Sequence, residues 1–301
     1  PLTARVAVNH TWKNLFGRAL VATLNDFGTR GDMPTHPELL NWLAVKFSSP
    51  AALGGFGWSR KALVKSIVTS ASYRQSSYTR PELEQRDPTN QWLARQNRFR
   101  LEAETVRDIY LAASGLLNVA IGGPSFRPPL PPDIAALGYA SNLKWEQSQG
   151  GNQYRRGMYI FFQRTVPYPM LMTFDAPDSN TTCTGRERSN TPLQALTLLN
   201  DPVFFECAQA LGLRVAQEPS GLEEKIQRAF RICLSRDPNE AEMNRLRRLH
   251  AGHVAQLNER RVDAALIAGQ EKSDAPEVVE KAALVALSRV IMNLDEFVTR
   301  E

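Results

Sequence analysis

The chain has 301 residues, of which 43% are hydrophobic and 22% charged, a composition ordinary for a globular protein with a sizeable core. No apolar run approaches the roughly 18 residues of a membrane-spanning helix, so we expect no membrane span. The formal net charge of +5 suits an anionic partner without requiring one. Because the helical pattern begins almost at Pro1, we expect the chain to be one piece of a longer precursor.

Helical periodicity and capping signals dominate the first part of the chain. Apolar residues recur at helical spacing over residues 3–16, and Gly17 is a natural C-terminal stop. Thr35 and Glu38 have the spacing of a capping box, which predicts the start of a second helix. Another amphipathic helix is expected over residues 101–117. Four tryptophans lie in helical patterns and are expected to be core residues: Trp12, Trp42, Trp58 and Trp92.

Residues 118–153 change character and interrupt the helical pattern. The run GGPSFRPPLPP cannot be helical, because proline fixes φ and removes the amide donor. Met158–Phe162 is the best strand candidate, with the segments around Phe126 and over residues 168–174 as its partners. We therefore expect a small β element and no sheet-based domain.

The last third of the chain returns to helical patterns. Thr191 is expected to cap a helix that has proline at its first position, and Asp201 repeats this device before the next helix. Residues 237–240 have the pattern of a second capping box. The last clear helix is expected over residues 276–292.

These elements predict a mainly α fold: a multi-helix domain with a small β element and an irregular, proline-rich central segment. Residues 1–301 form a single domain in this interpretation. Its alternative is two helical subdomains, residues 1–121 and 189–301, joined by the irregular segment 122–188.

The segment from residue 155 to residue 201 has the highest density of charged, proline and aromatic residues, as expected of a functional loop held by a scaffold. Its guanidinium groups could converge on an anionic ligand, beside a helix start at Asn190. The alternative is an internal Arg–Asp network that holds the irregular segment together. The arginines concerned are Arg155, Arg156, Arg164, Arg186 and Arg188.

Two groups of residues are candidates for catalysis. Asp175 and Asp178 are close enough in sequence to act as acid and base or to bind a hard cation, but each could equally order the loop by accepting hydrogen bonds. His10 could be held by Asp26 as a dyad, although no nucleophile accompanies them, and a structural histidine is the alternative.

Two further sets of side chains could contribute to a binding cleft. One face of the helix near residue 104 carries Arg100, Glu104, Arg107 and Asp108, which could line the same cleft or form a solvated salt-bridge face. Tyr139 and Trp145 lie in a polar segment, where an exposed aromatic ring could stack on a sugar or on a partner protein.

Cysteine usage argues against a cofactor in this chain. The cysteines Cys183, Cys207 and Cys233 are too few for a disulfide framework, and they form neither a CxxC nor a CxxCH motif. We expect Cys207 and Cys233 to be buried thiols, with a single bridge between them as the alternative. No metal site is expected.

Several long strings resemble one family, the planctomycete domain called PSD1 or DUF1553, over nearly the whole chain. The resemblance implies an exported, extracytoplasmic protein, in which this domain follows a DUF1549 domain and often accompanies a cytochrome c-like domain. Any haem would then be bound by an associated domain. The family has no established activity or catalytic residue. The strings are VNHTWKNLFGRALVATLNDFGTRGDMPTHPELLNWLA, WSRKALVKSIVTSASYRQSS, RFRLEAETVRDIYLAASGLL, GGPSFRPP, RRGMYIFFQRTVPYPMLMTFDAPD and SNTPLQALTLLNDPVFFE.

Three hypotheses of function follow. The leading one is a module of a larger exported protein that binds an anionic or carbohydrate ligand, or a partner domain, in a cleft built by residues 122–201. The second is a polymer hydrolase that uses Asp175 and Asp178 or the His10–Asp26 pair. The third is a redox accessory domain that docks a cytochrome c-like domain. Nucleic-acid binding has the weakest support, because no recognition motif is present.

Overall fold

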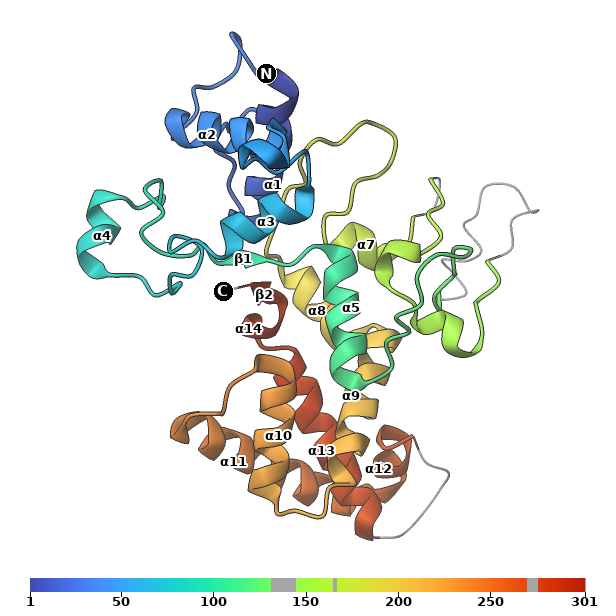
Figure 1. The fold of residues 1–301 in the computed structure, drawn as a ribbon. Coiled ribbons are helices and arrows are strands. Elements are labelled where there is room, and N and C mark those ends of the chain that lie inside the picture. Colours follow the sequence, from blue (N-terminus) through green and yellow to red (C-terminus); the bar gives the residue numbers. More distant parts are fainter. Residues whose placement is uncertain (131–144, 165–166, 270–275, 301) are drawn as a thin grey trace. The chain divides into compact units, whose positions relative to one another are not determined.

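The computed structural model of the chain describes residues 1–130, 145–164, 167–269 and 276–300 (Figure 1). Helices dominate these residues, and the only sheet among them has two strands of two residues each, β1 (Phe99–Arg100) and β2 (Thr299–Arg300). The mainly α fold class with a small β element is therefore confirmed. The chain divides into two compact units, residues 1–99 with Arg300 and residues 100–299. The division falls between residues 99 and 100, and it differs from the alternative of two subdomains, residues 1–121 and 189–301, joined by residues 122–188.

The first unit is a small helical body built around α1. Its buried core joins Val8, Trp12 and Phe16 of α1 to side chains of α2 and α3. Gly17 ends α1 in the left-handed conformation, with its N–H bonded to the carbonyl of Lys13, as predicted. The helices are α1 (Leu2–Phe16), α2 (Pro37–Ser48), the short 3₁₀ turn η1 (Ala51–Leu53), α3 (Arg60–Val68) and α4 (Pro81–Arg86).

Two predictions for this unit are wrong. The capping box at Thr35 does not form, because the Thr35 amide donates to the carbonyl of Leu20 at 2.9 Å and α2 begins after His36 without a side-chain cap. Trp12 is buried, but Trp42, Trp58 and Trp92 are each more than half exposed. The face of α2 that packs inward carries Leu40, Leu43 and Phe47, which leaves Trp42 on the outside.

The second unit packs its helices around α5, α9 and α13. Gly212 of α9 lies so close to α13 that a Cβ atom there would be 2.6 Å from the Cα of Val285, so these two helices need the glycine. Tyr110 of α5 is buried and donates its hydroxyl to the carbonyl of Met292 at 2.6 Å. The elements are α5 (Ala103–Ser114), η2 (Gly150–Tyr154), η3 (Gly157–Tyr159), α7 (Pro169–Thr173), α8 (Pro192–Asn200), α9 (Pro202–Ala216), α10 (Leu222–Leu234), α11 (Glu240–Glu259), α12 (Arg261–Ile267), α13 (Pro276–Met292) and α14 (Asp295–Val298).

The predicted caps of α8 and α9 are confirmed. The Thr191 side chain accepts the Gln194 amide at 3.3 Å, and Asp201 accepts the Val203 amide at 2.9 Å. The box predicted over residues 237–240 forms two residues further on. There the Asn239 side chain accepts the amide of Glu242, while the Glu242 carboxylate accepts the amide of Asn239.

The predicted strand over Met158–Phe162 does not form. Phe126 does lie beside Ile160, but the contact is a single parallel bridge, and a second bridge joins Asn118 to Arg155. Residues 157–159 form the 3₁₀ turn η3, and Pro169 begins a helix where a partner strand was expected. The irregular central segment is therefore held mainly by side chains and turns.

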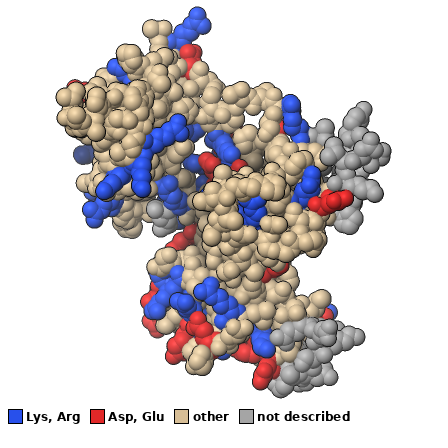
Figure 2. All heavy atoms as spheres, turned by 45° about the vertical axis from the view of Figure 1, so that its right-hand side comes forward, with Lys and Arg blue, Asp and Glu red and all other residues tan. Residues whose placement is uncertain are grey.

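Opposite charges alternate on the surface of the second unit. In Figure 2 the lower part of the molecule shows Lys and Arg interleaved with Asp and Glu. Ion pairs of the second unit include Arg228 with Glu218 at 3.2 Å and the exposed pair of Arg231 with Asp237, which share two contacts. On the visible face and among the described residues, these opposite charges therefore neutralise one another locally.

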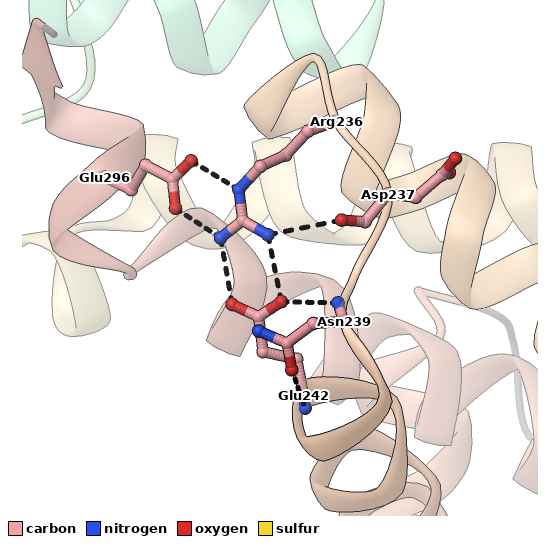
Figure 3. A network of polar contacts seen from close by, with 5 residues as sticks. All are labelled: Arg236, Asp237, Asn239, Glu242 and Glu296. Atoms are coloured by element: carbon pink, nitrogen blue, oxygen red, sulfur yellow. Dashed lines mark hydrogen bonds and ion pairs between the residues drawn. The ribbon is translucent and has the colours of Figure 1, made fainter. Parts of the chain in front are cut away.

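One ion-pair network joins three helices of the second unit (Figure 3). Arg236 follows α10 and donates to both carboxylate oxygens of Glu296 in α14, at 2.7 and 2.6 Å. It also donates to both carboxylate oxygens of Glu242 in α11, each at 2.9 Å. These hydrogen bonds raise the pKa of Arg236 and lower that of Glu242. Two forked contacts on one guanidinium fix the ends of these helices.

The cysteines remain free thiols. Cys207 is buried and Cys233 partly so, and burial raises the pKa of each to about 12. Thiols with so high a pKa are inert at neutral pH.

Candidate functional site

The central segment is anchored on α5 by a buried guanidinium. Arg107 is 1% exposed and donates to the carbonyls of Arg155 at 2.8 Å and Gln153 at 2.7 Å. Its guanidinium also lies 5.1 Å from the ring centre of Phe126. Burial lowers the pKa of Arg107, and nearby groups that include Tyr168 and Asp201 oppose this shift. The carbonyl contacts tie the turn η2 to the middle of α5.

The neighbouring residue Asp108 holds the next turn. Its carboxylate accepts the Gly157 amide at 2.6 Å and the Nε of Arg156 at 3.3 Å. Gly157 presses so closely on α5 that a Cβ atom there would be 2.8 Å from the Cα of Glu104. The face of α5 that the sequence offered as a cleft wall is therefore covered by residues 153–157.

Arg155 is a second buried guanidinium, only 4% exposed. Its two terminal nitrogens donate to the carbonyls of Pro124 and Gly122, and its guanidinium lies 4.2 Å from the ring centre of Tyr159. Arg155 thus fastens the glycine-proline loop before residue 127 to η2 and η3. All three of these contacts lie within the protein, and none of them is to a carboxylate.

The other predicted arginines also have partners inside the chain. Arg186 forks onto Glu104, with Nη1 and Nη2 at 2.6 and 3.0 Å from its carboxylate oxygens. Arg188 contacts Glu102 at 3.3 Å, and Arg164 donates to the side-chain oxygen of Asn180 at 3.1 Å. Burial alone would raise the pKa of Glu104, but the hydrogen bonds and charge of Arg186 together with a backbone hydrogen bond outweigh it and lower that pKa.

The two predicted aspartates have separate surroundings. Asp175 accepts the Ser189 amide at 2.7 Å and the Ser189 hydroxyl at 2.8 Å. Asp178 is exposed and accepts the amide and side chain of Asn180, and these bonds lower its pKa. Asn190 is exposed just before the cap of α8. These contacts have the geometry of loop ordering, since Asp175 binds the same loop 14 residues later and Asp178 binds it two residues later.

The predicted dyad lies in the first unit. His10 is a partly exposed residue of α1, and Asp26 is exposed in the loop after it. Over the part of the chain that the structure describes, no hydrogen bond or ion pair joins these two side chains.

A groove of about 330 Å³ lies between α7, α8 and the start of α9. Most of its wall is apolar, and two of its leucines on α8 are prominent, Leu193 at 60% and Leu196 at 53% exposure. The lining residues are Pro129, Tyr168, Pro169, Met170, Thr173, Leu193, Leu196, Thr197, Asn200, Asp201 and Pro202. They fall almost entirely within the stretch 122–201 in which a cleft was predicted.

One acid and one phenol line this groove. Asp201 is partly buried, and burial raises its pKa, although the hydrogen bond from the Val203 amide opposes the shift. Burial also raises the pKa of Tyr168. Trp145 lies nearly parallel to the Tyr168 ring at 6.5 Å and donates its indole N–H to the carbonyl of Pro128 at 2.8 Å. Trp145 is therefore a supporting residue behind the groove, and Tyr139 lies outside the described residues.

The sequence did not single out the groove residues. Leu193 and Leu196 are spaced as on the inner face of a helix and look like core, and Asp201 was recognised only as a cap. The available signal was the neighbouring Leu198, which is buried in α8 together with Gln194, because the four leucines of so short a helix cannot all point inward.

The described residues contain no group of three or more His, Cys, Asp or Glu side chains that could hold a metal ion. No helix among them is long and apolar enough to cross a membrane.

Comparison with known proteins gives one match. The family described as PSD1, protein of unknown function (DUF1553), matches residues 1–250. No curated protein and no solved structure matches the chain. The matched range contains the whole groove and both buried arginines.

Proposed function

We propose that this chain, which belongs to the PSD1 (DUF1553) family of unknown function, is a binding module that holds a polypeptide partner in the groove between α7 and α8. The exposure of Leu193 and Leu196 at the edge of an apolar groove is the observation that carries the proposal. Fully burying a leucine side chain contributes about 1.5–3 kcal/mol, so covering two half-exposed leucines favours association by about 2–3 kcal/mol.

The chemistry of the groove favours a polypeptide over an anionic ligand. As a carboxylate, Asp201 would repel an anion. The walls are aliphatic and proline side chains, which suit an apolar side chain of a partner, while Asn200 and Asp201 can accept hydrogen bonds from an adjacent amide or basic group. We therefore infer a partner segment with an apolar anchor and a neighbouring donor.

The family resemblance suggests which partners to test. Within this proposal they are the other domains of an exported precursor, a DUF1549-like domain and a cytochrome c-like domain. If the partner is the cytochrome c-like domain, the proposal includes the redox accessory role, in which the partner binds haem and this chain does not. An extracytoplasmic location belongs to the same proposal.

The test is a titration calorimetry measurement with each of the two domains as a separate purified protein. We expect one of them to bind, and the double variant Leu193→Ala/Leu196→Ala to weaken binding by roughly 30–150-fold, the equivalent of about 2–3 kcal/mol. Leu266→Ala on α12 is the matched control, because this leucine is 76% exposed and does not line the groove. Binding by neither domain, or equal losses in both variants, would refute the proposal.

The other hypotheses have less support from the geometry. An anionic or carbohydrate ligand at the predicted arginines would have to displace the partners that each guanidinium already has inside the chain. A hydrolase that uses Asp175 would first have to break the hydrogen bonds that this carboxylate accepts from Ser189. Asp201 is a better acid–base candidate than either predicted pair because its pKa is raised in a groove, but it is the one carboxyl lining that groove.

A further inference from the structure

Positive charge is concentrated in the first unit. Residues 1–99 contain 13 Lys and Arg against 6 Asp and Glu, a net charge of +7, although the whole chain carries only +5. Within this unit, the 43 residues from Leu39 to Pro81 contain six Lys and Arg and no acidic residue. In Figure 2 the upper left body shows more basic than acidic side chains on the visible face. A field of one sign of this kind attracts anions.

The helix α3 presents part of this charge on one face. Lys61 and Lys65 are exposed and lie four residues apart, hence about 6 Å along the helix and on the same side. Arg60 precedes them, and it is exposed too. None of these three side chains makes a hydrogen bond or ion pair with any residue that the structure describes. The buried residues of the helix, Leu63 and Ile67, face the core, so this charge is free to meet a ligand.

A fixed aromatic ring, Trp58, comes two residues before Arg60 in the chain, just ahead of the Ser59 cap of α3. Trp58 adopts a left-handed backbone conformation with φ of 64°, which costs a bulky residue about 1–2 kcal/mol. Its amide donates to the carbonyl of Phe47 at 2.8 Å, and its ring meets the Phe47 ring edge-on at 5.1 Å. Although these contacts fix the ring, 51% of the residue stays exposed. Residues held in strained backbone conformations cluster at active sites and ligand clamps, which makes Trp58 a candidate binding residue.

From this arrangement we propose that Trp58 and the exposed face of α3, with Arg60, Lys61 and Lys65, bind an acidic polysaccharide. The ring stacks on one sugar face, and the three cations contact carboxylate or sulfate groups of the neighbouring sugars. A single platform of this kind fits one sugar ring, whereas single-stranded nucleic acids are usually held by several successive aromatic platforms. This site is separate from the groove of the second unit and takes a different class of ligand.

The test measures binding of four probes by fluorescence anisotropy: a heparin decasaccharide, a decagalacturonate, a neutral dextran oligosaccharide and the oligonucleotide dT10. We expect one or both acidic oligosaccharides to bind at least tenfold more tightly than dextran and dT10, and the affinity to fall as salt screens the charges. Tighter binding of dT10 would overturn the choice of ligand, and equal binding of dextran would overturn the role of charge.

Variants of the bound surface localise the site. Lys61→Gln/Lys65→Gln is expected to lose at least tenfold in affinity for the acidic probe, and Trp58→Leu at least fivefold, with Trp58→Tyr recovering most of that loss. The matched control is Arg245→Gln/Arg248→Gln, an exposed pair on α11 that removes the same charge from another surface. We expect less than a twofold change in the control. If the control variant loses as much affinity as the lysine variant, only net charge matters and the proposal is overturned. Unchanged binding by a folded Trp58→Leu protein would overturn it as well.

Discussion

The buried guanidinium of Arg107 gives the most demanding test of how the central segment is held. We consider Arg107→Met, which keeps most of the side-chain volume and removes the charge. The substitution deletes two charge-assisted hydrogen bonds to carbonyls, at about 1.5–3 kcal/mol each, and the contact with the Phe126 ring, at about 0.5–2 kcal/mol. The substitution also removes the cost of burying a charge, which offsets this loss by several kcal/mol. The expected net loss of unfolding free energy is about 2–4 kcal/mol.

Urea unfolding followed by circular dichroism measures this loss, and hydrogen exchange locates it. We expect amides of residues 150–160 to lose protection, because the carbonyls of Gln153 and Arg155 lose their donor. Arg214→Met on α9 is the control: this arginine is exposed, so its loss should change stability by less than about 0.5 kcal/mol. A destabilisation by Arg107→Met below about 1 kcal/mol, or unchanged protection of residues 150–160, would show that the guanidinium does not hold this segment.

Three further predictions concern the second unit. Gly212→Ala should destabilise this unit by about 1–3 kcal/mol because α9 meets α13 at this glycine. Gly252→Ala, in open space on α11, should instead stabilise the unit by about 0.5–1 kcal/mol. Thermal melting distinguishes the two variants, and equal shifts in melting temperature would disprove the close approach of α9 and α13. Arg236→Ala should lower the free energy of unfolding by about 1–2 kcal/mol after allowance for solvent screening. Arg231→Ala, which removes an exposed ion pair, should change that free energy little. Urea titrations in which Arg231→Ala is the more destabilising variant would exclude the Arg236 network as a stabilising element. The raised pKa of Asp201 means that the folded chain holds this proton more tightly, so its contribution to stability falls as pH rises from about 3.8 through the folded pKa; Asp201→Asn should remove this fall, and an unchanged pH profile would contradict the assignment.

Local signals in the sequence were reliable where local chemistry decides the structure. Gly17, Thr191 and Asp201 act as predicted because a cap depends on the backbone within three or four residues. Thr35 has an equally good pattern, but a distant partner, the carbonyl of Leu20, takes its amide. A cap can thus be overridden by a contact that no local pattern contains.

Contacts between distant residues could not be predicted in the same way. The arginines of the central segment were recognised as a group, but the partners of Arg186 and Arg188, Glu104 and Glu102, lie more than 80 residues earlier in the chain. Helical spacing identifies which residues share a face and not which face packs inward, so Trp42 was assigned to the core and Leu193 was not recognised as exposed. The groove depends on both kinds of information, and the sequence alone supplies neither.

The central claim is that a partner polypeptide binds in the groove between α7 and α8. Its most direct test places the photoreactive residue p-benzoylphenylalanine at Leu196, and in a control protein at Leu266, and illuminates each with the DUF1549-like and cytochrome c-like domains present together. We predict covalent adducts with one of these domains from position 196 and none from position 266. No adducts from position 196, or equal yields from both positions, would contradict the claim.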